Sequence, residues 1–175
     1  MTTKFNNQYR IKSTRLRYWD YGSNAAYFVT ICTANKTHYF GEVVEGKMQL
    51  SQIGRFAEKC WHEIPEHFPF VALDGFVAMP NHVHGIIVIN KPVETQDFAS
   101  LRQNHNKFGP QSQNLASIVR GYKIGVTKHA KFLQIRFAWQ ARFYDHVIRD
   151  EDSYFRIAEY IQINPLQWQD DEYYL

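Results

Sequence analysis

Two histidines separated by a single residue form the first pattern in this 175-residue chain that could do chemistry. His82 and His84 open an apolar segment, residues 82–89, whose β-branched residues predict a strand. Because side chains two positions apart project from one face of a strand, both imidazoles could bind the same metal ion. A Pro-Asn turn precedes them, so we expect them near solvent. A chain with eight histidines also produces this spacing without a metal, and the pair alone leaves both interpretations open.

A tyrosine and an asparagine on the last predicted helix form the second pattern. This helix begins near Asp150 and Glu151, whose acidic side chains suit a helix N-terminus, and it ends at Asn164 and Pro165. Its apolar stripe faces the core and consists of Tyr154, Ile157, Ala158 and Ile161. Tyr160 and Asn164 are four residues apart, so they project from adjacent turns at the edge of that stripe. They either reach a common ligand or pack at the core edge and end the helix.

The elements that must position these residues alternate between strand and helix patterns. Residues 137–148 are aromatic and strand-like in places. The other expected elements are a strand over 26–33, a hairpin around Glu45 and Gly46, a helix from the N-cap Ser51 to Pro65, paired strands over 70–78 and 82–89, and a helix over 115–130. This order predicts one α+β domain over residues 1–175, in which an antiparallel sheet carries packed helices.

Charge is distributed unevenly along the chain. The formal net charge is +3, but residues 1–19 contain five basic residues and no acidic one. Such a basic N-terminal arm suggests a polyanionic partner, although a solvated tail explains it equally well. Residues 91–113 are rich in Gln, Asn and Ser, and we expect them to form a flexible loop.

Composition excludes several classes of protein. Hydrophobic residues make up 45% and charged residues 21%, as in ordinary globular proteins, and no run approaches the ~20 apolar residues of a membrane span. The N-terminus lacks the apolar core of a signal peptide. Cys32 and Cys60 show no pairing pattern, so we expect reduced, buried thiols in a cytoplasmic protein. The sequence contains neither a P-loop nor a GxSxG motif, which argues against P-loop nucleotide hydrolysis and serine-based acyl transfer.

Taken together, the two patterns resemble a known family, the HUH single-strand nucleases, and within it the REP-associated tyrosine transposases. Residues 78–87 (AMPNHVHGII) are similar to the strand that carries the family's His-hydrophobic-His motif. Residues 143–150 (FYDHVIRD) and 160–165 (YIQINP) are similar to its tyrosine segment, and residues 27–33 (YFVTICT) to its opening strand. The resemblance extends from about Arg15 to Trp168.

This resemblance implies a fold, a reaction and a partner. The fold would be a ferredoxin-like antiparallel sheet with helices on one side. His82 and His84 would bind a divalent metal ion, Mg²⁺ or Mn²⁺, with Asn164 as third ligand. Insertion-sequence relatives carry Gln at that position, and Gln162 is a weak substitute here. Tyr160 would be the nucleophile that cuts single-stranded DNA beside palindromic hairpins through a 5′-phosphotyrosine. Our candidates for DNA contacts are Arg10, Lys12, Arg15, Arg17, Arg120, Lys123 and Arg149.

Two other functions compete with this transposase interpretation. The first is a catalytically silent protein that binds DNA hairpins on the same scaffold. The second is a metal-dependent phosphodiesterase that uses water, in which Tyr160 is structural. The intact set of His82, His84, Tyr160 and Asn164 argues against the first. The sequence leaves open whether the protein is a monomer or a homodimer, and whether the tyrosine helix comes from a second subunit.

Overall fold

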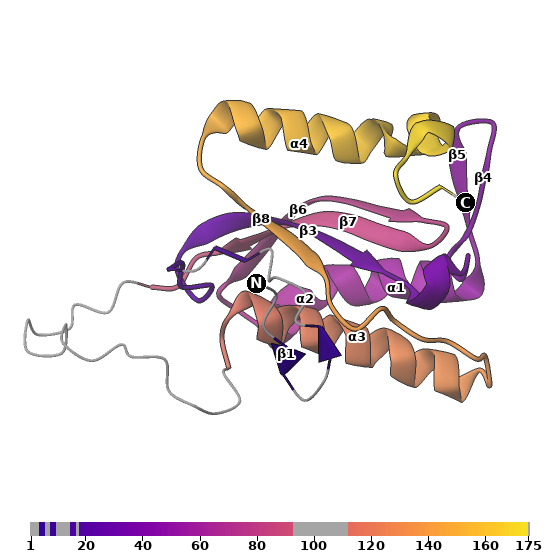
Figure 1. Ribbon diagram of the computed structural model, residues 1–175, viewed down its shortest axis with the longest axis horizontal. Helices are drawn as coiled ribbons and strands as arrows, with labels where there is room; N and C mark the ends of the chain where they lie inside the picture. The colour runs from indigo at the N-terminus through magenta and orange to yellow at the C-terminus, as the bar shows by residue number, and fades with distance from the viewer. Residues whose placement is uncertain (1–3, 6–7, 10–14, 17, 93–111, 175) are drawn as a thin grey trace, which may run out of the picture.

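A four-stranded antiparallel sheet forms the centre of the molecule. The computed structural model describes residues 4–5, 8–9, 15–16, 18–92 and 112–174. The strands lie in the order β6-β7-β3-β8 (Figure 1). With the helices α1 and α3, the chain order is β3-α1-β6-β7-α3-β8, which is the ferredoxin-like arrangement and confirms the α+β prediction. The strands and helices of this unit are β3 (Ala25–Cys32), α1 (Gln52–His62), β6 (Val71–Met79), β7 (His82–Ile89), α3 (Leu115–Phe132) and β8 (Tyr144–Ile148).

Smaller elements complete the described part of the chain. The predicted hairpin is β4 and β5, which pair on either side of Glu45 and Gly46. The remaining elements are β1 (Lys4–Phe5), β2 (Gln8–Tyr9), the 3-10 turn η1 (Ala34–Lys36), β4 (Gly41–Val44), β5 (Lys47–Leu50), α2 (Ile64–His67), α4 (Glu151–Ile163) and the 3-10 segment η2 (Asn164–Asp170).

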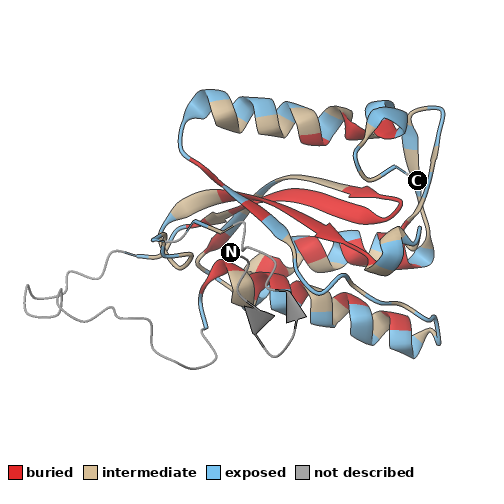
Figure 2. Cartoon of the chain, in the orientation of Figure 1, coloured by how far each residue is buried: buried red, intermediate tan, exposed pale blue. Residues whose placement is uncertain are grey.

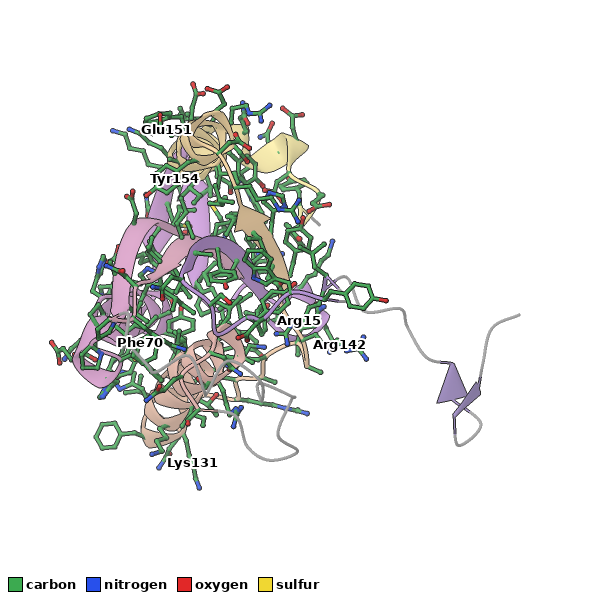
Figure 3. The ribbon with its side chains drawn as sticks, turned by 90° about the vertical axis from the view of Figure 1, so that its left-hand side faces the viewer. Arg15, Phe70, Lys131, Arg142, Glu151 and Tyr154 are labelled. Atoms are coloured by element: carbon green, nitrogen blue, oxygen red, sulfur yellow. The ribbon has the colours of Figure 1, made fainter. Side chains whose placement is uncertain are left out.

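Helices cover both faces of the sheet, not one as the family resemblance implies. In Figure 1, α1, α2 and α3 lie below the sheet and α4 lies above it. The view in Figure 3 places Glu151 and Tyr154 of α4 at one end of the molecule and Lys131 of α3 at the other. Buried residues are concentrated in the sheet between these layers (Figure 2). The main core lies on the α1 and α3 side, whereas a small second core lies under α4 and comprises Phe28, Ile86, Ile148 and Ile161.

The helices begin where side chains satisfy their free backbone amides. Ser51 Oγ accepts a hydrogen bond from Gly54 N at 3.0 Å and caps α1, as predicted. Asp150 caps α4 by accepting from Ser153 N at 2.7 Å. Pro65 does not end the helical path, because it occupies the first turn of α2, where its missing amide donor is not needed.

Three predictions about segments have different outcomes. Only residues 144–148 of the aromatic stretch over 137–148 form a strand, although Trp139 makes an isolated bridge to Thr33. Residues 93–111 of the expected loop, and most of the basic arm over 1–19, lie outside the described residues. Within the described residues, no helix has the length and apolar content needed to cross a membrane.

Candidate metal and tyrosine site

The two histidines lie side by side at the start of the central strand β7. His82 is in register with Cys32 of β3, and His84 with Thr30. Their relative exposures are 0% and 1%, so the expectation that they lie near solvent is wrong. The reason is the C-terminal segment, which returns over this end of the sheet. The Tyr173 ring lies 4.6 Å from the His82 ring, centre to centre.

The two imidazoles face each other through the same ring nitrogen. His82 Nε2 and His84 Nε2 are 3.0 Å apart. Asn81 fixes the first ring, because its Nδ2 donates to the Tyr173 carbonyl at 2.9 Å and its Oδ1 accepts from His82 Nδ1 at 2.8 Å. Thr30 Oγ1 lies 2.9 Å from His84 Nδ1 and holds the second ring. Both Nε2 atoms therefore face one position between the rings.

Burial keeps both imidazoles unprotonated. Desolvation, followed by the charge of Lys36, lowers the pKa of His82 from 6.5 to about 3. Desolvation, followed by the neighbouring His82, lowers the pKa of His84 well below 6.5. The two Nε2 atoms, 3.0 Å apart, are within hydrogen-bond distance of each other and close enough to bind the same ion. Neutral imidazole is a good ligand for divalent transition metals, so this pair fits such an ion.

Tyr160 reaches the histidine pair from helix α4. Its hydroxyl lies 3.3 Å from His84 Nε2, and its ring makes an edge contact with Phe28. Burial raises the pKa of Tyr160 from 10 to about 12, and the carboxylates of Asp171 and Glu172 add to this effect. The phenol is therefore protonated at neutral pH and becomes a better nucleophile only if positive charge is brought beside it.

Contacts near both ends of α4 hold it over the sheet. Tyr154 in its first turn hydrogen-bonds to Asp74 Oδ2 on β6. Ile161 near its end is buried, with 2% exposure. Gly75 interrupts the pairing of β6 with β7 at φ 37°, and an added Cβ there would lie 3.3 Å from Ile161 Cδ1. The glycine thus permits both the bulge and the close approach of the helix.

Asn164, the third predicted ligand, lies with an aspartate that sequence reasoning missed. Asn164 is 1% exposed, and its Nδ2 donates to Asp171 Oδ2 at 3.0 Å. Its Oδ1 is buried without a hydrogen-bond partner in the structure, which suits a metal ligand. Asp171 offers a carboxylate oxygen that, with one nitrogen each from His82 and His84, forms a group within 4.8 Å. Gln162 is exposed.

No repeat pattern could have identified Asp171. It lies seven residues beyond Asn164 and is separated from it by the irregular segment η2, so helical spacing does not relate the two. The only available signal is the run of three acidic residues, 170–172, just after the Asn-Pro pair. The site therefore combines side chains from β7, α4 and the C-terminal segment.

The predicted DNA contacts in the N-terminal arm are described only at Arg15. Its Nε pairs with Asp145 Oδ1 of β8 at 3.2 Å, and its guanidinium lies 5.0 Å from the centres of the Tyr21 and Phe143 rings. Arg15 thus attaches the arm to the sheet. The other three predicted contacts lie outside the described residues, namely Arg10, Lys12 and Arg17.

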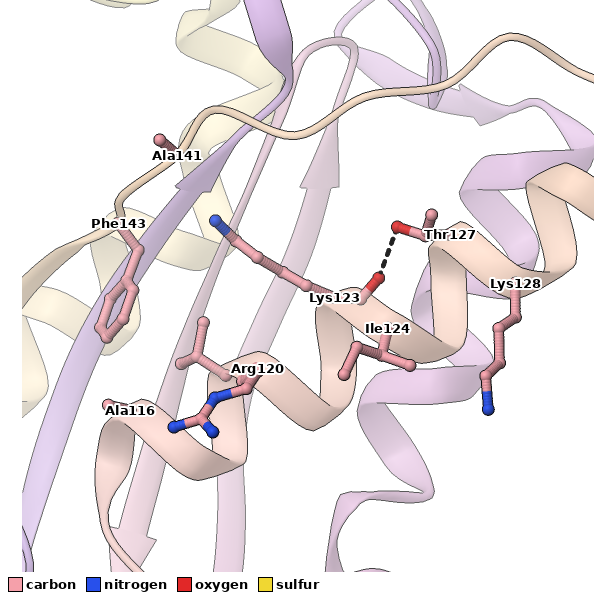
Figure 4. A pocket seen from close by; sticks show the side chains of 9 residues that line it. Ala116, Arg120, Lys123, Ile124, Thr127, Lys128, Ala141 and Phe143 are labelled. Carbon is pink, nitrogen blue, oxygen red and sulfur yellow. Dashed lines mark hydrogen bonds between the residues drawn. The ribbon is translucent and has the colours of Figure 1, made fainter. Parts of the chain in front are cut away.

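The two predicted contacts on α3 lie on the opposite face of the sheet from the histidines. Arg120 and Lys123 line a groove of about 410 Å³ between α3 and residues 141–143 (Figure 4). Lys123 Nζ donates to the carbonyls of Gln140 and Arg142, and burial lowers its pKa to about 8. Arg149, the last predicted contact, is exposed just after β8. The structure does not gather these cations around the histidine pair.

Comparison with known proteins places the chain in a family and its fold among transposases. No model of a known protein family matches it. An uncharacterized protein of Haemophilus influenzae is 44% identical over 180 residues, which cover 100% of this chain and 99% of that protein. A REP-associated tyrosine transposase, solved bound to a REP hairpin, superimposes with a TM-score of 0.60 at 18% identity, over 90% of this chain and 74% of the other.

The fold is thus that of the REP-associated tyrosine transposases, as the motifs predicted. The chain itself belongs to the same family as the Haemophilus influenzae protein, which it matches over its whole length.

Proposed function

We propose that this protein is a metal-dependent transposase that cuts and rejoins single-stranded DNA beside hairpins through Tyr160. One observation carries the proposal. The Nε2 atoms of His82 and His84, the Tyr160 hydroxyl and the unpartnered Asn164 Oδ1 come from separate elements into one small region. Packing alone gives no reason to bury an unsatisfied amide oxygen beside two imidazoles.

Each residue would have a distinct role in that region. His82 and His84 would hold a divalent metal ion, with Asn164 Oδ1 and an Asp171 carboxylate oxygen as further ligands. Nitrogen donors combined with oxygen donors suit Mn²⁺ better than Mg²⁺. The bound ion would supply Lewis-acid stabilisation of the charge that develops on the scissile phosphate. Asn81 and Thr30 would orient the two rings.

The chemical step would be a transesterification. The Tyr160 oxygen forms a bond to phosphorus while the bond from phosphorus to the 3′ oxygen breaks. The products are a 5′-phosphotyrosine and a free 3′-hydroxyl. The phenolic proton leaves to solvent, which the half-buried phenol can reach, and the departing 3′ oxygen takes up a proton from solvent. Because the phosphoester bond is kept in the adduct, another 3′-hydroxyl can later attack it and rejoin strands without a nucleotide cofactor.

An adduct assay tests this function. The protein would be incubated with Mn²⁺ and end-labelled single-stranded hairpins taken from repeats near its own gene, and complexes that survive SDS would be scored. We expect a shifted band that requires metal, with the modification in the tryptic peptide 157–175, because no Lys or Arg follows Arg156. Tyr160→Phe would abolish the band. Tyr174→Phe is the matched control, since this exposed tyrosine should leave the band unchanged.

Two other outcomes would replace the proposal. Cleavage that persists in Tyr160→Phe would indicate a phosphodiesterase that uses water. Tight hairpin binding without cleavage or adduct would indicate a silent DNA-binding protein, and one observation favours this second candidate. Tyr173 lies against the His82 ring and its carbonyl is bonded to Asn81, so the C-terminal segment covers part of the histidine pair.

The same proposal covers location and assembly. We propose that the protein acts in the cytoplasm on chromosomal DNA. Its tyrosine and histidines meet within a single chain, with the Tyr160 hydroxyl 3.3 Å from His84 Nε2, so a monomer would suffice for cleavage.

A further inference from the structure

Strand β8 carries exposed rings beside the candidate site. Tyr144 is in register with Thr30, and His146 with Phe28. Thr30 bonds His84, so these β8 side chains lie on the face of the sheet that carries the histidine pair. We define the aromatic shelf as Phe28, Tyr144 and His146.

Helix α4 leaves this part of the face uncovered. The helix packs on β6 and β7, whereas β8 is the edge strand on the other side of β3. Tyr144 is 45% exposed and His146 is also exposed, while Ile148 further along β8 is only 8% exposed beneath the start of α4. The shelf therefore opens to solvent next to a buried site.

The rings form a continuous path from the site to the sheet edge. Phe28 stacks on His84 with ring centres 5.3 Å apart, and Tyr144 meets Phe28 edge-on at 6.3 Å. Phe28 also meets Tyr160 edge-on, at 6.2 Å. A flat group lying on Tyr144 would thus be close to the nucleophile and to the histidine pair.

Basic side chains lie at both ends of the shelf strand, whereas the acidic Asp171 and Glu172 lie on the Tyr160 side. Exposed Arg142 and Arg149 flank β8 at its two ends. The acidic residue within the strand, Asp145, is buried on the opposite face and pairs with Arg15. Aromatic rings bordered by arginines are the chemistry with which proteins bind single-stranded nucleic acid, because unpaired bases can stack and the backbone is anionic. A duplex stem cannot use the rings in this way, since its bases are already stacked and paired.

We propose that the aromatic shelf stacks unpaired bases of the single-stranded DNA that flanks the scissile phosphate. This inference rests on the proposed function and adds a positioning surface to it. Tyr144 supplies the principal stacking ring, and Phe28 supports it from below. Stacking on the shelf fixes the strand so that its phosphate lies at Tyr160.

Photo-crosslinking locates the bases directly. A short oligothymidylate in which single positions carry 5-iodouracil would be irradiated with the wild-type protein and digested with trypsin. Cleavage after Arg142 and Arg149 places Tyr144 and His146 together in peptide 143–149. We expect the crosslink in that peptide. Covalent attachment by the proposed nucleophile would instead mark peptide 157–175, so the two events are read separately.

Affinity measurements test the role of the ring. Tyr144→Ala should weaken binding of labelled oligothymidylate about 5- to 100-fold, whereas Tyr144→Phe should remain within about 2-fold of wild type. Phe155→Ala is the matched control, because this 67% exposed ring lies on α4 away from the shelf. Binding of a blunt duplex should be the same in all three variants.

These results separate a failure of the proposed shelf from a failure of the proposed reaction. Wild-type affinity in Tyr144→Ala, or crosslinks confined to other peptides, would overturn the shelf even if the adduct with Tyr160 forms. Conversely, loss of oligothymidylate binding in Tyr144→Ala together with a crosslink in peptide 143–149 would establish the shelf even if no adduct forms. A circular-dichroism melt of Tyr144→Ala close to that of wild type would show that the change acts on binding and not on folding.

Discussion

Replacing Thr30 by valine tests how one ring of the proposed metal site is held in place. Thr30 is 2% exposed, and its hydroxyl lies 2.9 Å from His84 Nδ1. Valine has nearly the same shape and suits a strand, so the change removes little besides that contact. His84 Nδ1 would then be buried without a partner, which should lower the free energy of unfolding by about 1–3 kcal/mol. Loss of a contact that orients a ligand typically weakens metal binding about 10- to 100-fold, or about 1.4–2.8 kcal/mol.

Calorimetric titration with Mn²⁺ and urea unfolding measure the two effects separately. Thr127→Val is the control, because the Thr127 hydroxyl is exposed and bonds only the Lys123 carbonyl of its own helix. This variant should bind Mn²⁺ like wild type. If Thr30→Val is less stable but binds Mn²⁺ with unchanged affinity, the Thr30 contact does not support a metal ligand. If the wild-type protein binds no Mn²⁺, the histidine pair is a core feature and not a metal site.

Three further predictions concern the site and its surroundings. Asp171→Asn should weaken Mn²⁺ binding in calorimetry while leaving the fold intact, and unchanged affinity would remove Asp171 from the ligand set. Gly85→Ala should lower stability to urea by about 1–3 kcal/mol, because its Cβ would lie 2.2 Å from Trp61 Cζ2 in the core; wild-type stability would show that the ring can move. Burial raises the pKa of Cys60 from 9 to about 11, so iodoacetamide at pH 8 should alkylate it about 100-fold more slowly than in the urea-unfolded chain, and equal rates would contradict this reasoning.

The sequence predicted the elements well because local signals agree with the fold. Ser51 and the Glu45-Gly46 turn act within a few residues, and the structure contains the helix cap and the hairpin that they indicate. The strand over residues 82–89 is central and largely buried, as its continuous apolar pattern indicated. Pro65 was misinterpreted because the same residue type ends one helix and begins another.

Relations between distant segments were harder to predict. Periodicity placed Tyr160 and Asn164 on one helix, but it could not show that Asp171 returns to the same point after an irregular turn. The pairing of Arg15 with Asp145 joins residues 130 positions apart, and no local pattern encodes it. The layer that contains α4 was also missed, because an amphipathic stripe specifies that a helix packs on a sheet without specifying which face.

Because the core beneath α4 is small, this helix should open more easily than the rest of the domain. Helix α4 contributes one buried residue, Ile161. The sheet and its other helices share a far larger core. Elements with few enclosed side chains open at lower free energy than the whole domain. Tyr160 and Asn164 leave with α4 when it opens, whereas His82 and His84 stay with the sheet. Heating should therefore abolish the proposed strand cleavage before the sheet melts, and amide protons of α4 should exchange ahead of those of β7.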